Sequence, residues 1–229
     1  MHNIKQRFLG KNVHYHYGIK EMNKSFNYVK KNCIPGEGEI LFLEPKNTIT
    51  YTKQYGKRHL LVNTNILTKH NINLVEADRG GDITFHGKGQ LVGYPIIKLP
   101  KLKNCTHKYE VDIGSYINKL ENALLLSSRK LGIKNAITID QYRGIWIKTN
   151  NEFYKFISLG IGIAKGITRH GFAINININY NKFLKYIIPC GLKNMKIINI
   201  SEILHNIKLK VSLKYICNTI TKYINNVFT

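Results

Sequence analysis

Apolar side chains recur at helical spacing in three stretches of the chain. From Gly18 to Asn32 they return every three or four residues, and Pro35-Gly36 then breaks the run. The same period runs from Tyr109 to Leu131, and Gly132 follows where a helix would stop. A third helical stretch covers Val211 to Val227. The pattern predicts helices near the start, the centre and the end of the chain.

Short runs rich in β-branched and aromatic residues fill the chain between these helices. They predict strands at Ile40–Leu43, Ile49–Thr52, Leu74–Ala77, Gln90–Ile97, Ala136–Ile139, Gly144–Lys148, Phe153–Ile163 and Thr168–Ile178. Asn150-Asn151 is typical of a hairpin turn, and the alternation in Asn175–Asn179 indicates a strand rather than a disordered asparagine tract. With no internal repeat and no linker, the pattern predicts an α+β fold, in which one domain over residues 1–229 packs a mixed β-sheet against helices.

Length and composition fit one soluble domain. With 229 residues and 43% hydrophobic content, the chain can bury a sizeable core. Met1–Lys11 is polar and basic, unlike a signal peptide, and no apolar stretch reaches membrane-spanning length. Cys33, Cys105, Cys190 and Cys217 lack the paired spacing of a zinc site or a redox dithiol. We expect a soluble protein with free thiols, no bound metal and no membrane partner.

The formal charge of +22 favours an anionic partner. Nucleic acid, an acidic protein surface and an anionic membrane would all satisfy it. However, the lysines are spread along the whole chain. An A+T-rich genome favours the codons of lysine, asparagine and isoleucine, so these residues accumulate at surface positions whatever the function. The sequence also lacks the interleaved aromatic and basic motifs of common nucleic-acid readers, so we expect no nucleic acid partner.

The segment Arg79–Gln90 concentrates glycines together with an arginine and a histidine. Glycine permits positive φ angles and close approach to a ligand, so its N–H groups can face a carbonyl or an anion. The spacing matches neither a phosphate-cradling P-loop nor a dinucleotide fingerprint. The residues alone therefore fit either a ligand-binding loop or a glycine-rich hairpin with exposed charge.

A resemblance to a known family favours the ligand-binding interpretation of this segment. With Gln90–Pro95 directly after it, the segment resembles the signature of the lipoyl(octanoyl) transferases, within the biotin/lipoate protein ligase superfamily. It differs from the Gly-Gly-Gly version found in lipoate-activating ligases. Three later segments resemble the family in order and spacing, namely Lys155–Gly160, His170–Asn175 and Ile188–Gly191. The resemblance implies a biotin/lipoate ligase-like single domain that transfers an octanoyl group.

The resemblance also implies a catalytic cysteine/lysine dyad, with Cys190 as the nucleophile and Lys155 as its partner. A free thiol is mostly protonated at neutral pH, and a nearby ammonium stabilises the thiolate. Once the cysteine is acylated, the lysine loses its anionic neighbour and can accept a proton from an incoming amine. The alternative for Cys190 is a small buried core thiol, but its place between Pro189 and Gly191 favours a turn and a catalytic role.

Further positions line the substrate site in proteins that this sequence resembles. They are Arg79, Gly80, Gly81, Asp82, Ile83, Thr84, Phe85, His86, Ser158, Leu159, Gly160, Gly171, Phe172 and Ala173. Backbone N–H groups near Gly171–Ala173 or His86 are candidates for holding the thioester oxyanion. His86 and His170 are candidates for hydrogen bonding inside the site, although a lone histidine in a strand is more often structural. Phe156 stands where the family usually carries a small aliphatic residue, and we expect it to reshape the acyl pocket.

The implied reaction is the first step of endogenous protein lipoylation. Octanoyl-acyl carrier protein is the implied donor, and the acceptor is a lipoyl domain of a 2-oxoacid dehydrogenase complex or the H protein of glycine cleavage. Thioester exchange is near thermoneutral and amide formation is downhill, so we expect no cofactor, ATP or metal. We expect a monomer, in the cytoplasm if bacterial and in an apicoplast-like plastid or a mitochondrion if eukaryotic.

Two other enzyme classes remain as alternatives. An ATP-dependent lipoate or biotin protein ligase would use Lys155 against an acyl-adenylate and would not need Cys190. A papain-like protease fits less well, because both candidate histidines precede the cysteine and no matching local signature surrounds it.

Overall fold

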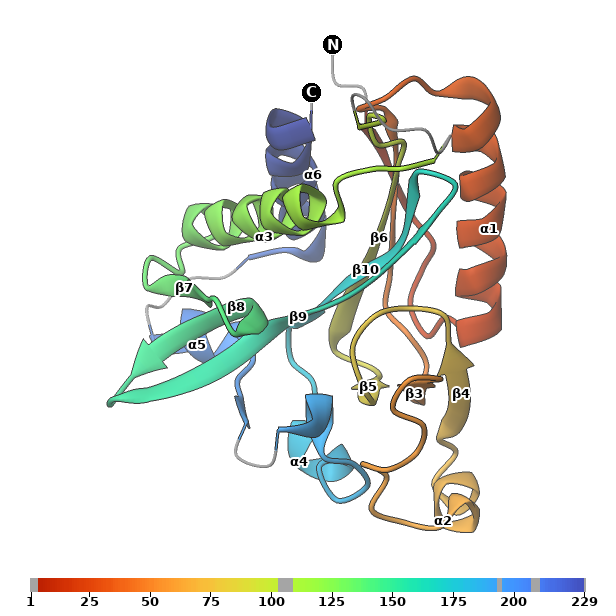
Figure 1. Cartoon of the computed structure of the whole chain (residues 1–229). Helices are drawn as coiled ribbons and strands as arrows, with labels where there is room; N and C mark the ends of the chain where they lie inside the picture. Colours follow the sequence, from red (N-terminus) through yellow and green to blue (C-terminus); the bar gives the residue numbers. More distant parts are fainter. Residues whose placement is uncertain (1–3, 103–108, 193–194, 207–210, 229) are drawn as a thin grey trace.

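An eight-stranded mixed sheet runs through the computed structural model, which describes residues 4–102, 109–192, 195–206 and 211–228 (Figure 1). In spatial order its strands are β1 (Ile4–Phe8), β2 (Gly38–Leu43), β6 (Gln90–Ile97), β10 (Ile167–Asn175), β9 (Glu152–Ala164), β8 (Tyr142–Thr149) and β7 (Ala136–Ile139), with β11 (Lys196–Ile197) also on β9. The β1–β2 and β9–β11 pairs are parallel and the others antiparallel. The mixed sheet confirms the predicted α+β class.

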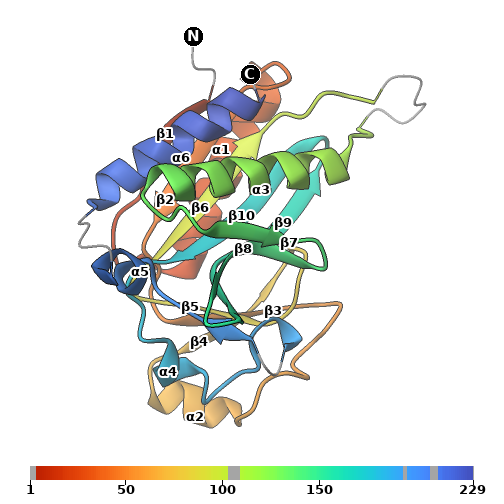
Figure 2. The same ribbon diagram turned by 90° about the vertical axis from the view of Figure 1, so that its left-hand side faces the viewer.

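Helices cover both faces of this sheet. On one face lie α3 (Ile113–Lys130) and α6 (Leu213–Phe228), which cross in front of the strands in Figure 2, and α1 (Tyr15–Asn32) lies on the other. Alternating side chains of β2 join the two cores, Phe42 on the α3 side and Leu41 on the α1 side. The apolar residues that recur at helical spacing in the sequence therefore form the face that each helix buries against the sheet.

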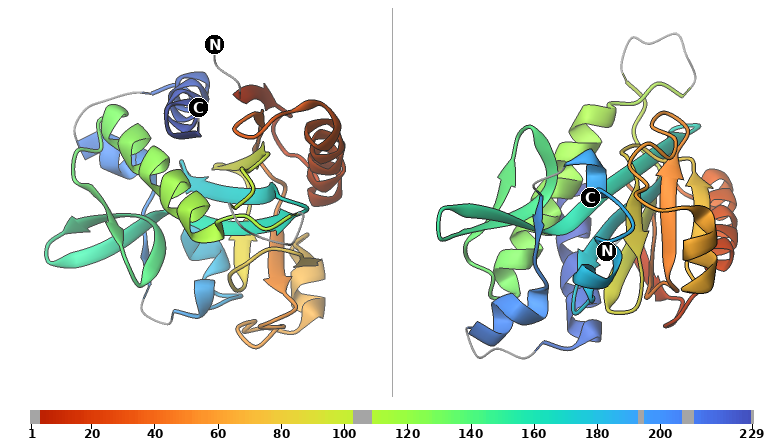
Figure 3. Two further views of the ribbon diagram at one scale, coloured as in Figure 1. Left: turned by 45° about the horizontal axis from the view of Figure 1, so that its top comes forward. Right: turned by 90° about the horizontal axis from the view of Figure 1, so that it is seen from below.

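A smaller sheet stands beside the main one (Figure 3). It has the order β4 (Asn73–Ala77), β3 (Thr48–Thr52), β5 (Thr84–His86), and it is accompanied by the short helices α2 (Thr64–Lys69) and α4 (Tyr180–Phe183). The rings of Phe85 and Phe183 stack with centroids 4.0 Å apart. The Arg79–Gln90 segment crosses from this small sheet to β6, so it borders the space between the two sheets.

The structure confirms each predicted helix and strand to within a few residues and corrects several details. Asn150 and Asn151 both have positive φ angles, 49° and 59°, as the predicted hairpin turn requires. The strand predicted over Thr168–Ile178 ends at Asn175, because the N–H groups of Ile176 and Asn177 both turn to the carbonyl of Gly89. The sequence pattern did not predict β1, β5, β11, α2, α4 and α5 (Ile200–Asn206), all of them short.

The described cysteines are unpaired thiols. Cys33, Cys190 and Cys217 form no disulfide, and Cys105 lies outside the described residues. Within the same described part of the chain, each helix is too short or too polar to span a bilayer.

Candidate active site

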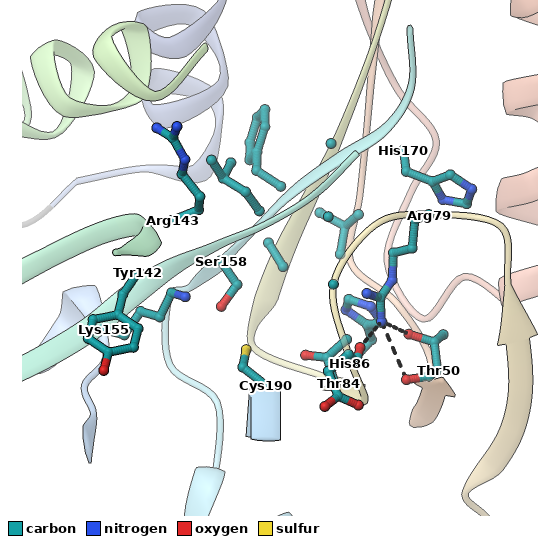
Figure 4. Close-up of a pocket in the computed structure, with 18 of the residues that line it drawn as sticks. Thr50, Arg79, Thr84, His86, Tyr142, Arg143, Lys155, Ser158, His170 and Cys190 are labelled. Atoms are coloured by element: carbon teal, nitrogen blue, oxygen red, sulfur yellow. Dashed lines mark hydrogen bonds between the residues drawn. The ribbon is translucent and has the colours of Figure 1, made fainter. Parts of the chain in front are cut away.

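A cavity of about 350 Å³ opens between the two sheets. Its floor comes from β9 and β10, and its opposite wall comes from the Arg79–Gln90 segment and the turn that carries Cys190. Figure 4 shows the sulfur of Cys190 and the amine of Lys155 directed into the same space, with Arg79 and His170 toward the other end. The cavity thus brings together segments that lie more than a hundred residues apart.

Cys190 sits in a single helical turn, Pro189–Gly191, with a left-handed backbone conformation of φ 55° and ψ 16°. Its N–H donates to the carbonyl of Ile83 at 3.1 Å, which ties the turn to the glycine-rich segment. A cysteine with positive φ is uncommon, and such conformations concentrate at functional sites. The predicted turn is therefore present, and its thiol is half-exposed to the cavity instead of being packed in a core.

A break in strand pairing puts Lys155 on the cavity side of β9. Ile145 of β8 pairs with Ile157, whereas the next residue, Trp146, pairs with Lys155, so Phe156 has no partner on β8. This one-residue bulge reverses the alternation of side chains along β9. In an unbroken strand, Lys155 and Ser158 would face opposite ways; here both line the cavity.

The bulge also determines which face of the sheet the Phe156 side chain occupies. Its side chain is fully buried in the core beneath α3 and α6, and it does not line the cavity. The expectation that Phe156 reshapes the acyl pocket is therefore wrong, because residue 156 faces the other side of the sheet from Lys155.

The amine of Lys155 is held with little water around it. The residue is only 5% exposed, and its Nζ lies 4.9 Å from the centre of the Trp146 ring. Burial lowers the pKa of Lys155, while the negative charges of the Cys190 thiolate and the Glu121 carboxylate oppose that shift. The protonation of this lysine therefore depends on whether its cysteine neighbour is charged.

Glycine at position 144 makes room for this lysine. A Cβ atom at Gly144 would lie 2.5 Å from Cε of Lys155 and 2.3 Å from the carbonyl oxygen of Ile157, and the residue has a φ of 124°. The Gly144 N–H donates to the buried carboxylate of Glu121 at 2.6 Å, and that carboxylate also accepts from Arg143 at 2.9 Å. The Lys155 site therefore rests on backbone geometry that only glycine provides.

Replacing Gly144 with alanine is expected to destabilise the protein by about 1–3 kcal/mol and to lower transfer activity, because Lys155 has to move. Urea unfolding and a transfer assay on the same preparation measure both effects. Gly114→Ala is the matched control: in the first turn of α3 the nearest atom to a new Cβ is 3.5 Å away. That variant should be neutral or slightly more stable. Equal behaviour of the two variants would contradict this account.

Arg79 is a half-buried arginine that lines the cavity and braces the loop. It donates to the hydroxyl of Thr50 at 2.7 Å and to the carbonyls of Asp82 at 2.9 Å and Gly80 at 3.1 Å. Burial lowers its pKa, and it makes no salt bridge with a carboxylate among the described residues. The geometry matches the loop-anchor reading of Arg79 and leaves a cationic group beside the cavity.

The two candidate histidines are both fixed by hydrogen bonds. Gln90 donates through Nε2 to Asn175, so its Oε1 accepts from Nδ1 of His86 at 2.8 Å. Burial lowers the pKa of His86 to about 4, and the ring is neutral at physiological pH. His170 contacts the Asp78 carboxylate through Nε2 at 2.7 Å. Both rings line the cavity at sites set by these partners.

The two candidate sources of oxyanion donors differ in their surroundings. Phe172 and Ala173 of β10 pair with both β6 and β9, so their strand lies inside the sheet and its N–H groups serve the ladders. His86 belongs to β5, which pairs only with β3 among the described strands and so has an unpaired edge. The His86 side of the cavity is therefore the better candidate for free backbone donors.

The structure divides the residues that the resemblance named for substrate binding. Those that line the cavity are Arg79, Gly81, Asp82, Thr84, His86, Ser158, Leu159, Gly160, Gly171, Phe172 and Ala173. Gly80, Ile83 and Phe85 do not; Ile83 and Phe85 are buried in the core of the small sheet. Other lining residues were not found from the sequence: Tyr15, Thr50, Tyr55, Val92, Tyr94, Gln141, Tyr142, Arg143 and Leu192.

Within the described part of the chain, no cluster of three or more histidine, cysteine, aspartate or glutamate side chains could hold a metal ion. The site instead presents a thiol, an amine and an arginine around a partly apolar cavity. Those groups suit acyl transfer through a nucleophilic thiol.

Proteins similar to this chain include octanoyltransferases. An octanoyltransferase from Clostridium kluyveri is 39% identical over 195 residues, which cover 85% of this chain and 77% of the relative. One from Koribacter versatilis is 31% identical, over 82% of this chain and 71% of the relative. A structure of a bipartite lipoate protein ligase from Thermoplasma acidophilum covers 98% of this chain and 82% of that chain, with a TM-score of 0.70; at 14% identity it supports the fold.

The class follows from the family model of the lipoyl protein ligase A/B catalytic domain, which matches residues 26–224. This class includes both transferases and ligases, and the two relatives described above are transferases. The chain therefore belongs to the octanoyltransferase family and is an acyltransferase that moves octanoyl groups in protein lipoylation.

Proposed function

We propose that the chain transfers octanoyl from acyl carrier protein to the lysine of a lipoyl domain through a thioester on Cys190. The single observation that carries this is the convergence of Cys190, on its left-handed turn, and the buried Lys155 on one cavity. A nucleophilic thiol beside a desolvated ammonium is the arrangement that activates cysteine.

In the first half-reaction, the Cys190 thiolate attacks the octanoyl thioester carbonyl. The new carbon–sulfur bond forms as the carrier's phosphopantetheine thiolate leaves and takes up a proton. The Lys155 ammonium stabilises the attacking thiolate, since little water competes for its charge at 5% exposure. A thioester is exchanged for a thioester, so no ATP is consumed.

In the second half-reaction, the lysine amine of the acceptor attacks the acyl-enzyme. Burial lowers the pKa of Lys155, and the negative charge of the Cys190 thiolate counteracts this shift. Acylation removes that charge, so the pKa of Lys155 falls further and its amine becomes a base. Lys155 then takes the proton from the attacking amine, and the Cys190 thiolate leaves as the amide forms. The enzyme returns to its starting state, and the kinetics are ping-pong.

The cavity offers an apolar wall for the acyl chain. Val92, Leu159, Phe172 and Ala173 line it beside the backbone of Gly160. Burying about seven methylene-sized groups at roughly 0.8 kcal/mol each supplies on the order of 5 kcal/mol of binding. This is enough for the cavity to select among acyl lengths.

The net charge of the chain and its similarity to a lipoate ligase both support the two proposed protein partners. The charge of +22 attracts an acidic acyl carrier protein and an acidic lipoyl domain alike. The similar ligase from Thermoplasma acidophilum is described together with its E2 lipoyl domain. We propose a monomer that meets the two partners in turn at the same cavity.

Intact-mass spectrometry of the protein mixed with octanoyl-acyl carrier protein, without ATP, tests the proposal. The expected result is a mass gain of one octanoyl group that hydroxylamine removes and that peptide mapping places on Cys190. Adding a lipoyl domain should then discharge the enzyme and modify the domain. Failure to acylate without ATP, together with lipoyl-domain modification once ATP is added, would instead establish the ligase.

A further inference from the structure

His59 lies outside the motifs found in the sequence, yet its segment is hydrogen-bonded to the chain that leads into the Cys190 turn. His59 follows β3, and its carbonyl accepts from the N–H of Ile188 at 2.9 Å. Leu60 forms a bridge with Ile187, and the Leu61 N–H donates to the carbonyl of Tyr186. The chain that enters the Cys190 turn is therefore paired with the chain around His59.

The side chain of His59 completes the connection. Its Nδ1 lies 2.6 Å from Oδ2 of Asp82, and the other carboxylate oxygen accepts from the N–H of Ile83 at 2.6 Å. The carbonyl of Ile83 in turn accepts from the N–H of Cys190. The carboxylate of Asp82 is buried, so its hydrogen bonds are little exposed to competition from water.

The pair also lies directly behind the nucleophile. A Cβ atom at Gly191 would lie 2.8 Å from Oδ2 of Asp82 and 2.8 Å from Cε1 of His59. Cys190 and Gly191 have consecutive φ angles of 55° and 68°. For cysteine that conformation is costly, and it persists only where its surroundings impose it.

We propose that His59 is a positioning residue that, through Asp82, holds the Cys190 turn in the conformation that presents the thiol to the cavity. The proposal rests on Cys190 being the nucleophile of the proposed function. His59 takes no part in bond formation; it acts through Asp82 and the turn. Loss of its hydrogen bond should let the turn relax toward ordinary φ angles and carry the thiol away from the acyl group.

Two substitutions separate the hydrogen bond from the bulk of the ring. His59→Leu keeps most of the volume and removes the donor, whereas His59→Asn keeps a donor near the position of Nδ1 and removes the ring. His205→Ala is the control, because His205 is exposed in the last turn of α5 and does not line the cavity. Single-turnover acylation by saturating octanoyl carrier and alkylation of Cys190 by iodoacetamide are measured on each, with the melting temperature alongside.

The expected result is that His59→Leu slows acylation by about 10- to 100-fold, since a small misplacement of a reacting group has effects of this size. The apparent donor affinity should not change. His59→Asn should recover most of the rate, and His205→Ala should match wild type. Wild-type acylation by His59→Leu, or equal slowing in the Leu and Asn variants, would overturn the positioning role.

The alkylation readout separates this proposal from the proposed function. If the wild type fails to take an octanoyl group, the transferase mechanism fails, yet iodoacetamide still reports the state of the thiol. A changed alkylation rate in His59→Leu, restored in His59→Asn, would support the positioning role even then. An unchanged rate would reject it.

Discussion

Cys190→Ala should abolish octanoyl transfer, with kcat falling by about 10⁴-fold or more, because the proposed reaction runs through a thioester that only the Cys190 thiol can form there. Lys155 remains in place in this variant, and so does the binding cavity, so donor binding should survive. A coupled assay of lipoyl-domain octanoylation measures the loss, and intact mass should show no adduct on the variant. The fold should be little affected, since the thiol is half-exposed at a turn.

Cys33→Ala is the matched control for this experiment. Cys33 is also half-buried and unpaired, but it lies at the end of α1, away from the cavity. That variant should transfer octanoyl at the wild-type rate. If Cys190→Ala kept substantial activity, or regained it with ATP, a thioester on Cys190 could not be the route.

Lys155→Met should slow both half-reactions, with an overall loss of about 10²- to 10⁴-fold, the range typical of a general acid–base group. Methionine fills similar space beneath Trp146 but has no charge to stabilise a thiolate and no lone pair to accept a proton. The variant should therefore acylate slowly and also discharge slowly to an amine. Rapid-quench measurement of each half-reaction separates the two effects.

The pH dependence distinguishes Lys155 from a residue that only fills space. Burial lowers the pKa of Lys155, so the neutral base becomes available below the pH at which an exposed lysine titrates. Discharge of the acyl-enzyme should therefore rise with pH through this lowered pKa and then level off in the wild type. That step should vanish in Lys155→Met. A wild-type profile in the variant would exclude Lys155 as the base. Lys148→Met, on an exposed part of β8, serves as the control.

Parts of the fold could be read from the sequence because their signals are local. The apolar periods of α1, α3 and α6 mark the faces that these helices bury, and long strands such as β6 are rich in residues that suit a pleated surface. The short elements were missed since a few residues carry too little pattern. The strand β1 and the small sheet owe their form to partners distant in the chain.

The sequence by itself determined which residues are candidates for the site. Its motifs resemble those of the lipoyl(octanoyl) transferases, and that resemblance named Cys190, Lys155 and Arg79, because motif residues keep their order and spacing along the chain. Only the tertiary structure decided where these groups point. A bulge opposite Trp146 turns Lys155 to the cavity and Phe156 to the core, through a register that depends on two strands at once. His59 reaches the Cys190 turn only by folding, since contact across such a sequence separation leaves no trace in local pattern.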